Sequence, residues 1–120
     1  MSQESTALRN SRHAHKMERV LIDTFIVPEE SKPAFLEGAR RVQSFLRTLP
    51  GFVEGFLYEK EDEESRYNFL TTAVWESEAA LENAKRAVAV EFQKLGFNPQ
   101  ETTKRLTIES VRSTYERSSY

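Results

Sequence analysis

The sequence predicts an α+β domain in which four strands form an antiparallel sheet and two helices cover one of its faces. Three observations support this prediction. Apolar residues alternate or cluster over four short spans, as in strands, and recur at three- and four-residue steps over two longer spans, as in helices. Cap and turn residues separate the spans in the order strand, helix, strand, strand, helix, strand. A chain of 120 residues has room for one such domain.

The regular pattern begins at Met17. Residues 1–16 show no periodicity and contain little apolar surface. We therefore expect residues 1–16 to be an N-terminal extension and residues 17–120 to form the domain. Both histidines of the chain, His13 and His15, fall in the extension.

The first strand is expected over residues 18–27, where β-branched and aromatic side chains dominate. Pro28 ends it, because proline has no N–H to donate to a sheet. Ser31 is a candidate cap for the helix that follows, and Pro33 is tolerated in the first turn. The apolar stripe of this helix comprises Phe35, Ala39, Val42, Leu46 and Leu49. A Pro-Gly pair at Pro50 ends the stripe.

The second and third strands are expected over residues 52–60 and 66–74. Residues 59–64 are six charged side chains in a row, and Ser65 follows them. Such a segment is too charged to be buried, so it is expected to form an exposed hairpin tip.

The second helix is expected to begin after Ser77, whose side chain is a typical cap, with acidic residues favourably placed at its positive end. Its apolar stripe comprises Leu81, Ala84, Val88, Phe92 and Leu95. Gly96 ends it. The Asn-Pro pair at Asn98 is expected to be a loop, and residues 105–113 the last strand. Residues 115–120 are polar and are expected to fray.

This order of elements gives the ferredoxin-like arrangement, with both helices on one side of the sheet. A sheet with one face in water alternates apolar and polar residues. In the first expected strand Leu21, Phe25 and Val27 oppose Val20, Ile22 and Ile26, and in the third Tyr67, Phe69, Ala73 and Trp75 oppose Leu70 and Val74. Both faces are thus apolar, and we expect a homodimer that packs sheet against sheet.

Composition narrows the class of protein. The net charge of −2 argues against nucleic acid as a partner, since binding it needs a clustered basic face. The absence of cysteine excludes disulfides and thiolate metal sites. No apolar run approaches the length of a membrane span, and no secretory signal is visible. We expect a cytoplasmic protein with no membrane partner.

Three segments resemble a known family. They are Leu-Pro-Gly-Phe at residues 49–52, the aromatic third strand, and Trp-Glu-Ser-Glu-Ala at residues 75–79. Over about residues 17–113 the chain resembles the antibiotic biosynthesis monooxygenase-like family of the dimeric α+β barrel superfamily. The resemblance implies a homodimer with one small hydrophobic pocket per subunit, between the helices and the sheet. Its ligand would be a small hydrophobic or aromatic molecule.

Some relatives oxygenate aromatic polyketides with O₂ and without metal or flavin. The resemblance therefore implies a cofactor-independent monooxygenase of a small hydroxyaromatic, quinol- or anthrone-like, with no cofactor and no metal. Such chemistry needs a dry aromatic pocket, a donor for the developing oxyanion and a base. The catalytic candidates are Trp75 with its indole N–H, Asn68 with its amide, and Asp23 as the base. The candidates for substrate binding are Tyr67, Phe69, Tyr58 and Phe25.

Other interpretations stay open. Haem degradation is disfavoured, because residues 18–27 contain no Asn and residues 77–95 contain no His to bind iron. A non-catalytic dimer that binds a small hydrophobic ligand, or a cofactor-free isomerase, would fit the same barrel. Trp75 can also be a plain core residue, and Asp23 can pair with Arg19 or Arg105.

Overall fold

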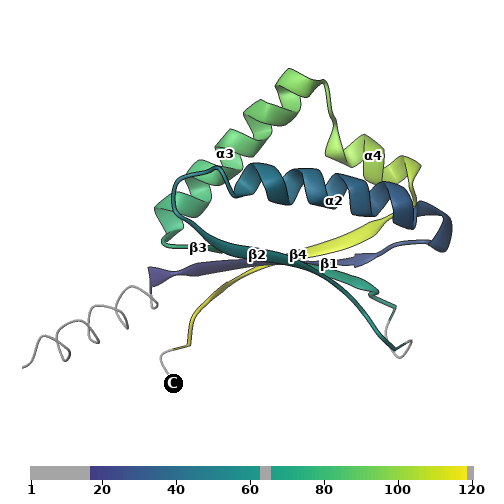
Figure 1. The fold of residues 1–120 in the computed structure, drawn as a ribbon, viewed down its shortest axis with the longest axis horizontal. Coiled ribbons are helices and arrows are strands. Elements are labelled where there is room, and N and C mark those ends of the chain that lie inside the picture. Colours follow the sequence, from purple (N-terminus) through teal and green to yellow (C-terminus); the bar gives the residue numbers. More distant parts are fainter. Residues whose placement is uncertain (1–16, 63–65, 119–120) are drawn as a thin grey trace, which may run out of the picture.

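The computed structural model describes residues 17–62 and 66–118. Their elements are β1 (Arg19–Ile26), the 3₁₀ helix η1 (Glu29–Ser31), α2 (Lys32–Leu46), β2 (Phe52–Glu59), β3 (Phe69–Trp75), α3 (Glu78–Leu95), α4 (Pro99–Arg105) and β4 (Glu109–Glu116). The strands form one antiparallel sheet in the order β2-β3-β1-β4. All the labelled helices lie on the same side of it (Figure 1). The predicted ferredoxin-like α+β fold is confirmed. The predicted extension, residues 1–16, lies outside the described residues.

The start of α2 differs from the prediction. Ser31 does not cap this helix, since its side chain makes no capping hydrogen bond. Its buried hydroxyl donates instead to the carbonyl oxygen of Leu106 at 2.7 Å, which ties the start of α2 to the end of α4. The helix ends at Leu46, three residues earlier than the apolar stripe implied.

The turn from α2 to β2 requires glycine at Gly51. Its backbone has a positive φ of 81°. A Cβ atom there would also lie 2.5 Å from the Cβ atom of Ala80 on α3. The close approach of turn and helix explains why this glycine precedes β2.

The predicted start and end of α3 are confirmed. The Ser77 hydroxyl oxygen accepts a hydrogen bond from the Ala80 N–H at 3.1 Å, and Gly96 follows the helix with a left-handed φ of 65°. These are the ordinary N-terminal and C-terminal signals of a helix.

The short helix α4 is a correction to the predicted loop. The Asn98 side-chain oxygen accepts hydrogen bonds from the N–H groups of Gln100 and Glu101, at 3.0 and 3.2 Å, and Pro99 takes the first helical position. The domain thus has a third α-helix beyond the two predicted. The last strand begins at Glu109, four residues later than expected, because α4 and its exit occupy the residues before it.

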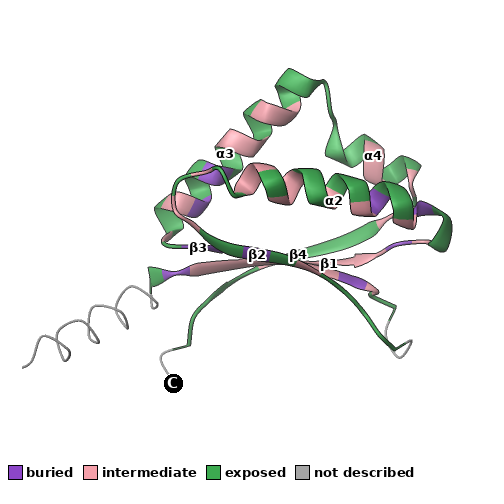
Figure 2. Cartoon of the chain, in the orientation of Figure 1, coloured by how far each residue is buried: buried purple, intermediate pink, exposed green. Residues whose placement is uncertain are grey.

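The core consists of two clusters between the sheet and the helices. The first contains the buried residues Ala73, Trp75, Leu81 and Ala84. The second contains Val27, Phe35 and Phe69. The helices α2 and α3 pack on β2 and β3, and β4 carries mostly exposed residues (Figure 2). The helix side of the sheet is therefore covered over β3 and open over β4.

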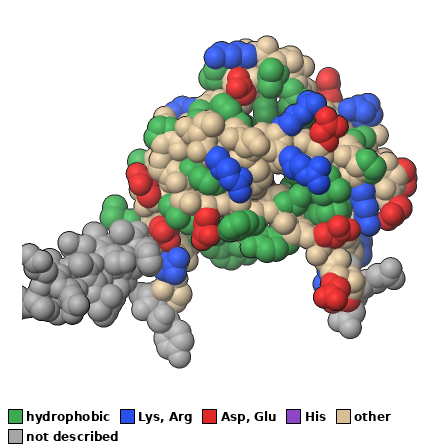
Figure 3. Space-filling view, viewed as in Figure 1, with side chains coloured by type: hydrophobic (Ala, Val, Ile, Leu, Met, Phe, Trp, Pro, Cys, Tyr) green, Lys and Arg blue, Asp and Glu red, His purple; other side chains and the backbone are tan. Residues whose placement is uncertain are grey.

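The opposite side of the sheet is apolar, as the sequence predicted. Strand register places its side chains together, because residues paired across antiparallel strands share a face. We call this surface the helix-free face. Its polar residues are Thr24, Glu54, Thr72 and Ser113, and its apolar residues are Val20, Ile22, Ile26, Phe56, Tyr58, Leu70, Val74, Val111 and Tyr115. Hydrophobic side chains gather along the underside of the sheet in Figure 3. Phe56, Tyr58, Val111 and Tyr115 are each about half exposed.

Candidate functional site

A cavity of about 420 Å³ lies between the sheet and the helices. Its floor comes from β1, β3 and β4, its walls from α2 and α3, and α4 contributes residues at one end. Most of the lining is apolar; its aromatic members are Phe25, Phe35, Trp75, Phe92 and Phe97. A small apolar or aromatic molecule fits a cavity of this size and lining. A second, more open hollow lies along α3, lined by residues of that helix between Asn83 and Lys94 and by Phe45 of α2.

Trp75 lines the cavity at the last position of β3. Its side chain is 1% exposed and meets the Phe52 ring edge-on, with the ring centres 5.4 Å apart. Its indole N–H has no hydrogen-bond partner among the described residues. Leaving a buried donor unpaired costs about 1–3 kcal/mol, so such groups often mark a site that a ligand or water completes.

Gln43 of α2 is the other cavity residue with an unpaired buried atom. Its amide nitrogen donates to the Thr72 carbonyl oxygen at 3.3 Å, and its side-chain oxygen has no partner within the described part of the chain. That oxygen points toward Gly55 of β2, where an added Cβ atom would lie 2.7 Å from it. Gln43 was not singled out from the sequence, because one polar residue in a helical stripe carries no signal of its contacts.

Asp23 lies in the cavity floor and is held by Arg112. The Nε and Nη2 atoms of Arg112 donate to the two carboxylate oxygens at 2.8 and 3.0 Å. The Asp23 side chain is only 15% exposed, whereas that of Arg112 is 61% exposed. These hydrogen bonds raise the pKa of the Arg112 guanidinium above its ordinary value. The partner of Asp23 is therefore Arg112, and Arg19 pairs instead with Glu116 at 3.8 Å.

A polar row crosses the apolar floor at this point. Thr71 of β3, Asp23 of β1 and Arg112 of β4 are register partners on neighbouring strands, and all three line the cavity. The flanking positions on β1 are Leu21 and Phe25. A ligand in the cavity would thus meet an ion pair and a hydroxyl group across the middle of the floor. Ser110 of β4, Gln43 of α2 and Lys85 of α3 are further polar residues of the lining.

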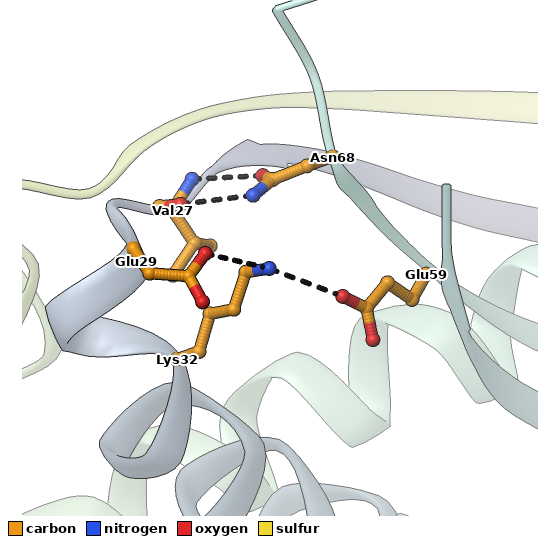
Figure 4. Close-up of polar contacts among 5 residues, drawn as sticks. All are labelled: Val27, Glu29, Lys32, Glu59 and Asn68. Atoms are coloured by element: carbon orange, nitrogen blue, oxygen red, sulfur yellow. Dashed lines mark hydrogen bonds and ion pairs between the residues drawn. The ribbon is translucent and has the colours of Figure 1, made fainter. Parts of the chain in front are cut away.

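Asn68 is not among the cavity residues. Its side-chain oxygen accepts from the Val27 N–H at 2.9 Å, and its amide nitrogen donates to the Val27 carbonyl at 2.8 Å (Figure 4). The amide therefore imitates a pair of backbone hydrogen bonds and extends the pairing between β1 and β3 by one step. Both hydrogen-bonding groups of this catalytic candidate are occupied by the backbone.

The four candidates for substrate binding are dispersed. Phe25 lines the cavity. Phe69 is 2% exposed and packs against the Phe35 ring, with the centres 4.8 Å apart. Tyr67 is 39% exposed, and Tyr58 is 52% exposed on the helix-free face. The geometry brings Phe25, Asp23 and Trp75 to one cavity and leaves the other candidates outside its lining.

Lys32 forms a second ionic cluster, outside the cavity, at the start of α2. Its ammonium nitrogen lies 3.0 Å from a carboxylate oxygen of Glu29 and 3.3 Å from one of Glu59 (Figure 4). The hydrogen bonds to Glu29 and then Glu59 raise the pKa of Lys32 above its ordinary value. The cluster links η1 and α2 to the end of β2.

Residues 17–62 and 66–118 contain no group of three or more His, Cys, Asp or Glu side chains arranged to hold a metal ion. No helix in that part of the chain is long and apolar enough to cross a membrane.

The profile of the antibiotic biosynthesis monooxygenase family matches residues 19–91, which run from β1 through most of α3. The chain belongs to this family. The family resemblance inferred from the sequence is confirmed. The match ends before α4 and β4, so Arg112 and the α4 part of the cavity lie beyond it. No curated protein matches the chain.

Solved structures of other proteins share the fold. A candidate monooxygenase from Shewanella loihica PV-4 is 24% identical, covers 83% of this chain and 93% of its own, and superposes with a TM-score of 0.64. SnoaB, a cofactor-independent oxygenase from Streptomyces nogalater, is 23% identical with a TM-score of 0.62, over 84% of this chain and 93% of SnoaB. A conserved protein from Methanosarcina mazei Go1 is 14% identical with a TM-score of 0.66, over 88% and 99% of the two chains.

Proposed function

We propose that this member of the family is a cofactor-independent monooxygenase that oxidises a small hydroxyaromatic, quinol- or anthrone-like, in the cavity. The observation that carries the proposal is the apolar cavity lined by Trp75, whose indole N–H has no partner in the described structure. Membership of the family and the similarity of the fold to SnoaB support it.

The chemistry places modest demands on the protein. In the net reaction a ring CH₂ carbon becomes a carbonyl. One oxygen atom of O₂ is retained in the new C=O group, the other leaves as water with the two hydrogens of that carbon, and the substrate supplies the four electrons that O₂ takes up. Deprotonation makes the substrate electron-rich enough to pass an electron to O₂ itself. The protein must exclude water, accept a proton and hold the substrate oxyanion.

Each of these tasks has a candidate in the cavity. The apolar walls exclude water, and the indole N–H of Trp75 is a donor for the oxyanion. Asp23 is the candidate proton acceptor, since each of its oxygens retains a lone pair after pairing with Arg112. Asn68 has no part in this assignment, because the Val27 backbone occupies its amide.

A second candidate function is a non-catalytic dimer that binds a small hydrophobic ligand. The ion pair of Asp23 with Arg112 is the observation that favours it, because the guanidinium already donates to both oxygens of the carboxylate that would accept the proton. A cofactor-free isomerase would use the same groups without consuming O₂.

We also propose that two copies pack through their helix-free faces. Four large side chains, Phe56, Tyr58, Val111 and Tyr115, are about half exposed there, beside further apolar residues of β1 and β3. Large apolar side chains thus lie on all four strands of this face, interrupted by Thr24, Thr72 and Ser113. This is more exposed apolar surface than a monomer usually leaves in water. A second copy offers the same self-complementary surface.

The test of the function is oxygen uptake in chelator-treated buffer with a panel of anthrones and hydroquinones. We expect uptake above the rate without protein, reduced about 100-fold in Trp75→Phe, which keeps an aromatic ring but removes the N–H. Asp23→Asn, which removes the proposed proton acceptor, should also lower the rate. Glu30→Gln, which neutralises an exposed carboxylate on η1, should leave the rate unchanged.

Uptake equal in the wild type and in both cavity variants would refute the assignment of the site. Product formed without oxygen consumption would identify an isomerase. No uptake, combined with tight binding of the same compounds, would establish the binding dimer instead.

A further inference from the structure

The charges around the cavity differ from those of the chain as a whole. The lining contains one acidic side chain, Asp23, and two basic ones, Lys85 and Arg112. Lys85 is paired with Glu82, at 3.3 Å. The whole chain has a formal net charge of −2. Because Glu82 offsets the charge of Lys85, Arg112 is the lining cation that can meet a negative group of a ligand.

Asp23 and Arg112 also differ in how deeply they are buried. Asp23 lies on the interior strand β1 beneath the helices, with its side chain 15% exposed. Arg112 lies on the edge strand β4, which the helices leave open, with its side chain 61% exposed. The carboxylate is therefore recessed in the floor, and the guanidinium stands at the open side of the cavity.

The pairing with Asp23 leaves one edge of the guanidinium available. Asp23 takes the Nε and Nη2 donors, and the Arg112 side chain makes no other hydrogen bond within the described residues. The edge formed by Nη1 and the second hydrogen of Nη2 can still donate two parallel hydrogen bonds, the geometry that suits carboxylate or sulfonate oxygens. Because Asp23 holds the plane of the group, little side-chain entropy remains to be lost when an anion binds.

From these three observations we propose that the cavity binds an amphipathic aromatic anion and that Arg112 determines this specificity. The flat apolar body lies among the aromatic and aliphatic walls, and its anionic oxygens lie against the free edge of Arg112 at the open side. Asp23 acts in this binding as a positioning residue for Arg112. The inference rests on the cavity assigned under the proposed function and extends it to the charge of the ligand.

The test compares two fluorescent probes with the same aromatic body. Anilinonaphthalene sulfonate carries an anionic group, and phenylnaphthylamine is its neutral counterpart. Both are titrated into the full-length protein. We expect the wild type to bind the sulfonate about tenfold more tightly than the neutral probe, the scale of one charge-assisted contact. Arg112→Gln should abolish this preference and leave binding of the neutral probe within about twofold.

Two further variants separate the causes. Arg66→Gln removes the same charge from an exposed pair with Glu109 outside the cavity, and should keep the preference. The double variant Asp23→Asn/Arg112→Gln leaves the net charge unchanged and should still lack it. A preference that returns in the double variant would overturn the proposal, because repulsion by an unpaired Asp23 would then explain the single variant.

Equal binding of the two probes by the wild type, binding of neither, or equal weakening of both in Arg112→Gln would also overturn it. These readouts need no turnover, so they are independent of the oxygen-uptake experiment. Anion preference without oxygen consumption would leave this inference intact and refute the oxygenase.

Discussion

Among single residues, Asn68 has the clearest structural role. It immediately precedes β3, and its two hydrogen bonds to Val27 continue the antiparallel pairing of β1 and β3 with a side chain in place of a backbone. Val27 is itself 3% exposed and belongs to the second core cluster. Removing the amide would leave buried N–H and C=O groups of Val27 without partners.

We therefore predict that Asn68→Ala lowers the free energy of unfolding by about 1–3 kcal/mol, measured by urea denaturation. Asn83→Ala, at an exposed position of α3, should change it by less than about 0.5 kcal/mol. An Asn68→Ala protein of wild-type stability that had lost its activity would contradict this role and restore Asn68 as a catalytic candidate.

Among the contacts between elements, Lys32 links the start of α2 to the end of β2. A cation is unfavourable near the positive N-terminal end of a helix, and here the carboxylates of Glu29 and Glu59 compensate for it. Their hydrogen bonds raise the pKa of Lys32 above its ordinary value of 10.5. Folding thus favours the charged form of this side chain.

This shift predicts a pH dependence at the alkaline end. Because the folded-state pKa exceeds the unfolded-state value, the contribution is fully present below the ordinary pKa and is lost as the pH rises through the folded value. We expect the stability difference between wild type and Lys32→Met to be constant from about pH 7 to pH 9 and to shrink above about pH 10. Urea denaturation across this range measures it. The explanation would be disproved if the stability difference between wild type and Lys32→Met stayed constant through the alkaline range. It would also be disproved if the stability difference for Lys94→Met, at an exposed position, declined in the same way.

Elements with strong periodicity could be predicted from the sequence, and contacts between distant elements could not. The strands, α2 and the capped helix α3 follow from local patterns that tertiary packing reinforces. The seven residues of α4 have no apolar stripe, although Asn98 followed by Pro99 is a helix-start signal that was available. The pairing of Asp23 with Arg112 spans 89 positions and depends on the β1–β4 register, which no local pattern specifies. The backbone partner of Asn68 is likewise set by tertiary structure, so no local pattern indicates that Val27 occupies its amide.

For the whole molecule, the proposed dimer makes a prediction with a closely matched control. Val111 on the helix-free face and Val90 on α3 are 49% and 51% exposed. We expect the wild type to sediment as a dimer at micromolar concentration and Val111→Lys to dissociate, because a buried charge opposes the interface. Val90→Lys should remain dimeric. A wild-type monomer at that concentration, or equal behaviour of the two variants, would exclude this assembly.

The position of Trp75 also makes the protein its own optical probe. The chain has one tryptophan, which lines the cavity and is 1% exposed. Its emission should be blue-shifted in the folded state, so a red shift would follow unfolding without any added label. A ligand that enters the cavity would perturb the same fluorophore. Ligand binding would therefore change the fluorescence intensity at the wavelength of the folded protein, whereas unfolding would shift the emission spectrum. Both events could be followed in unmodified protein.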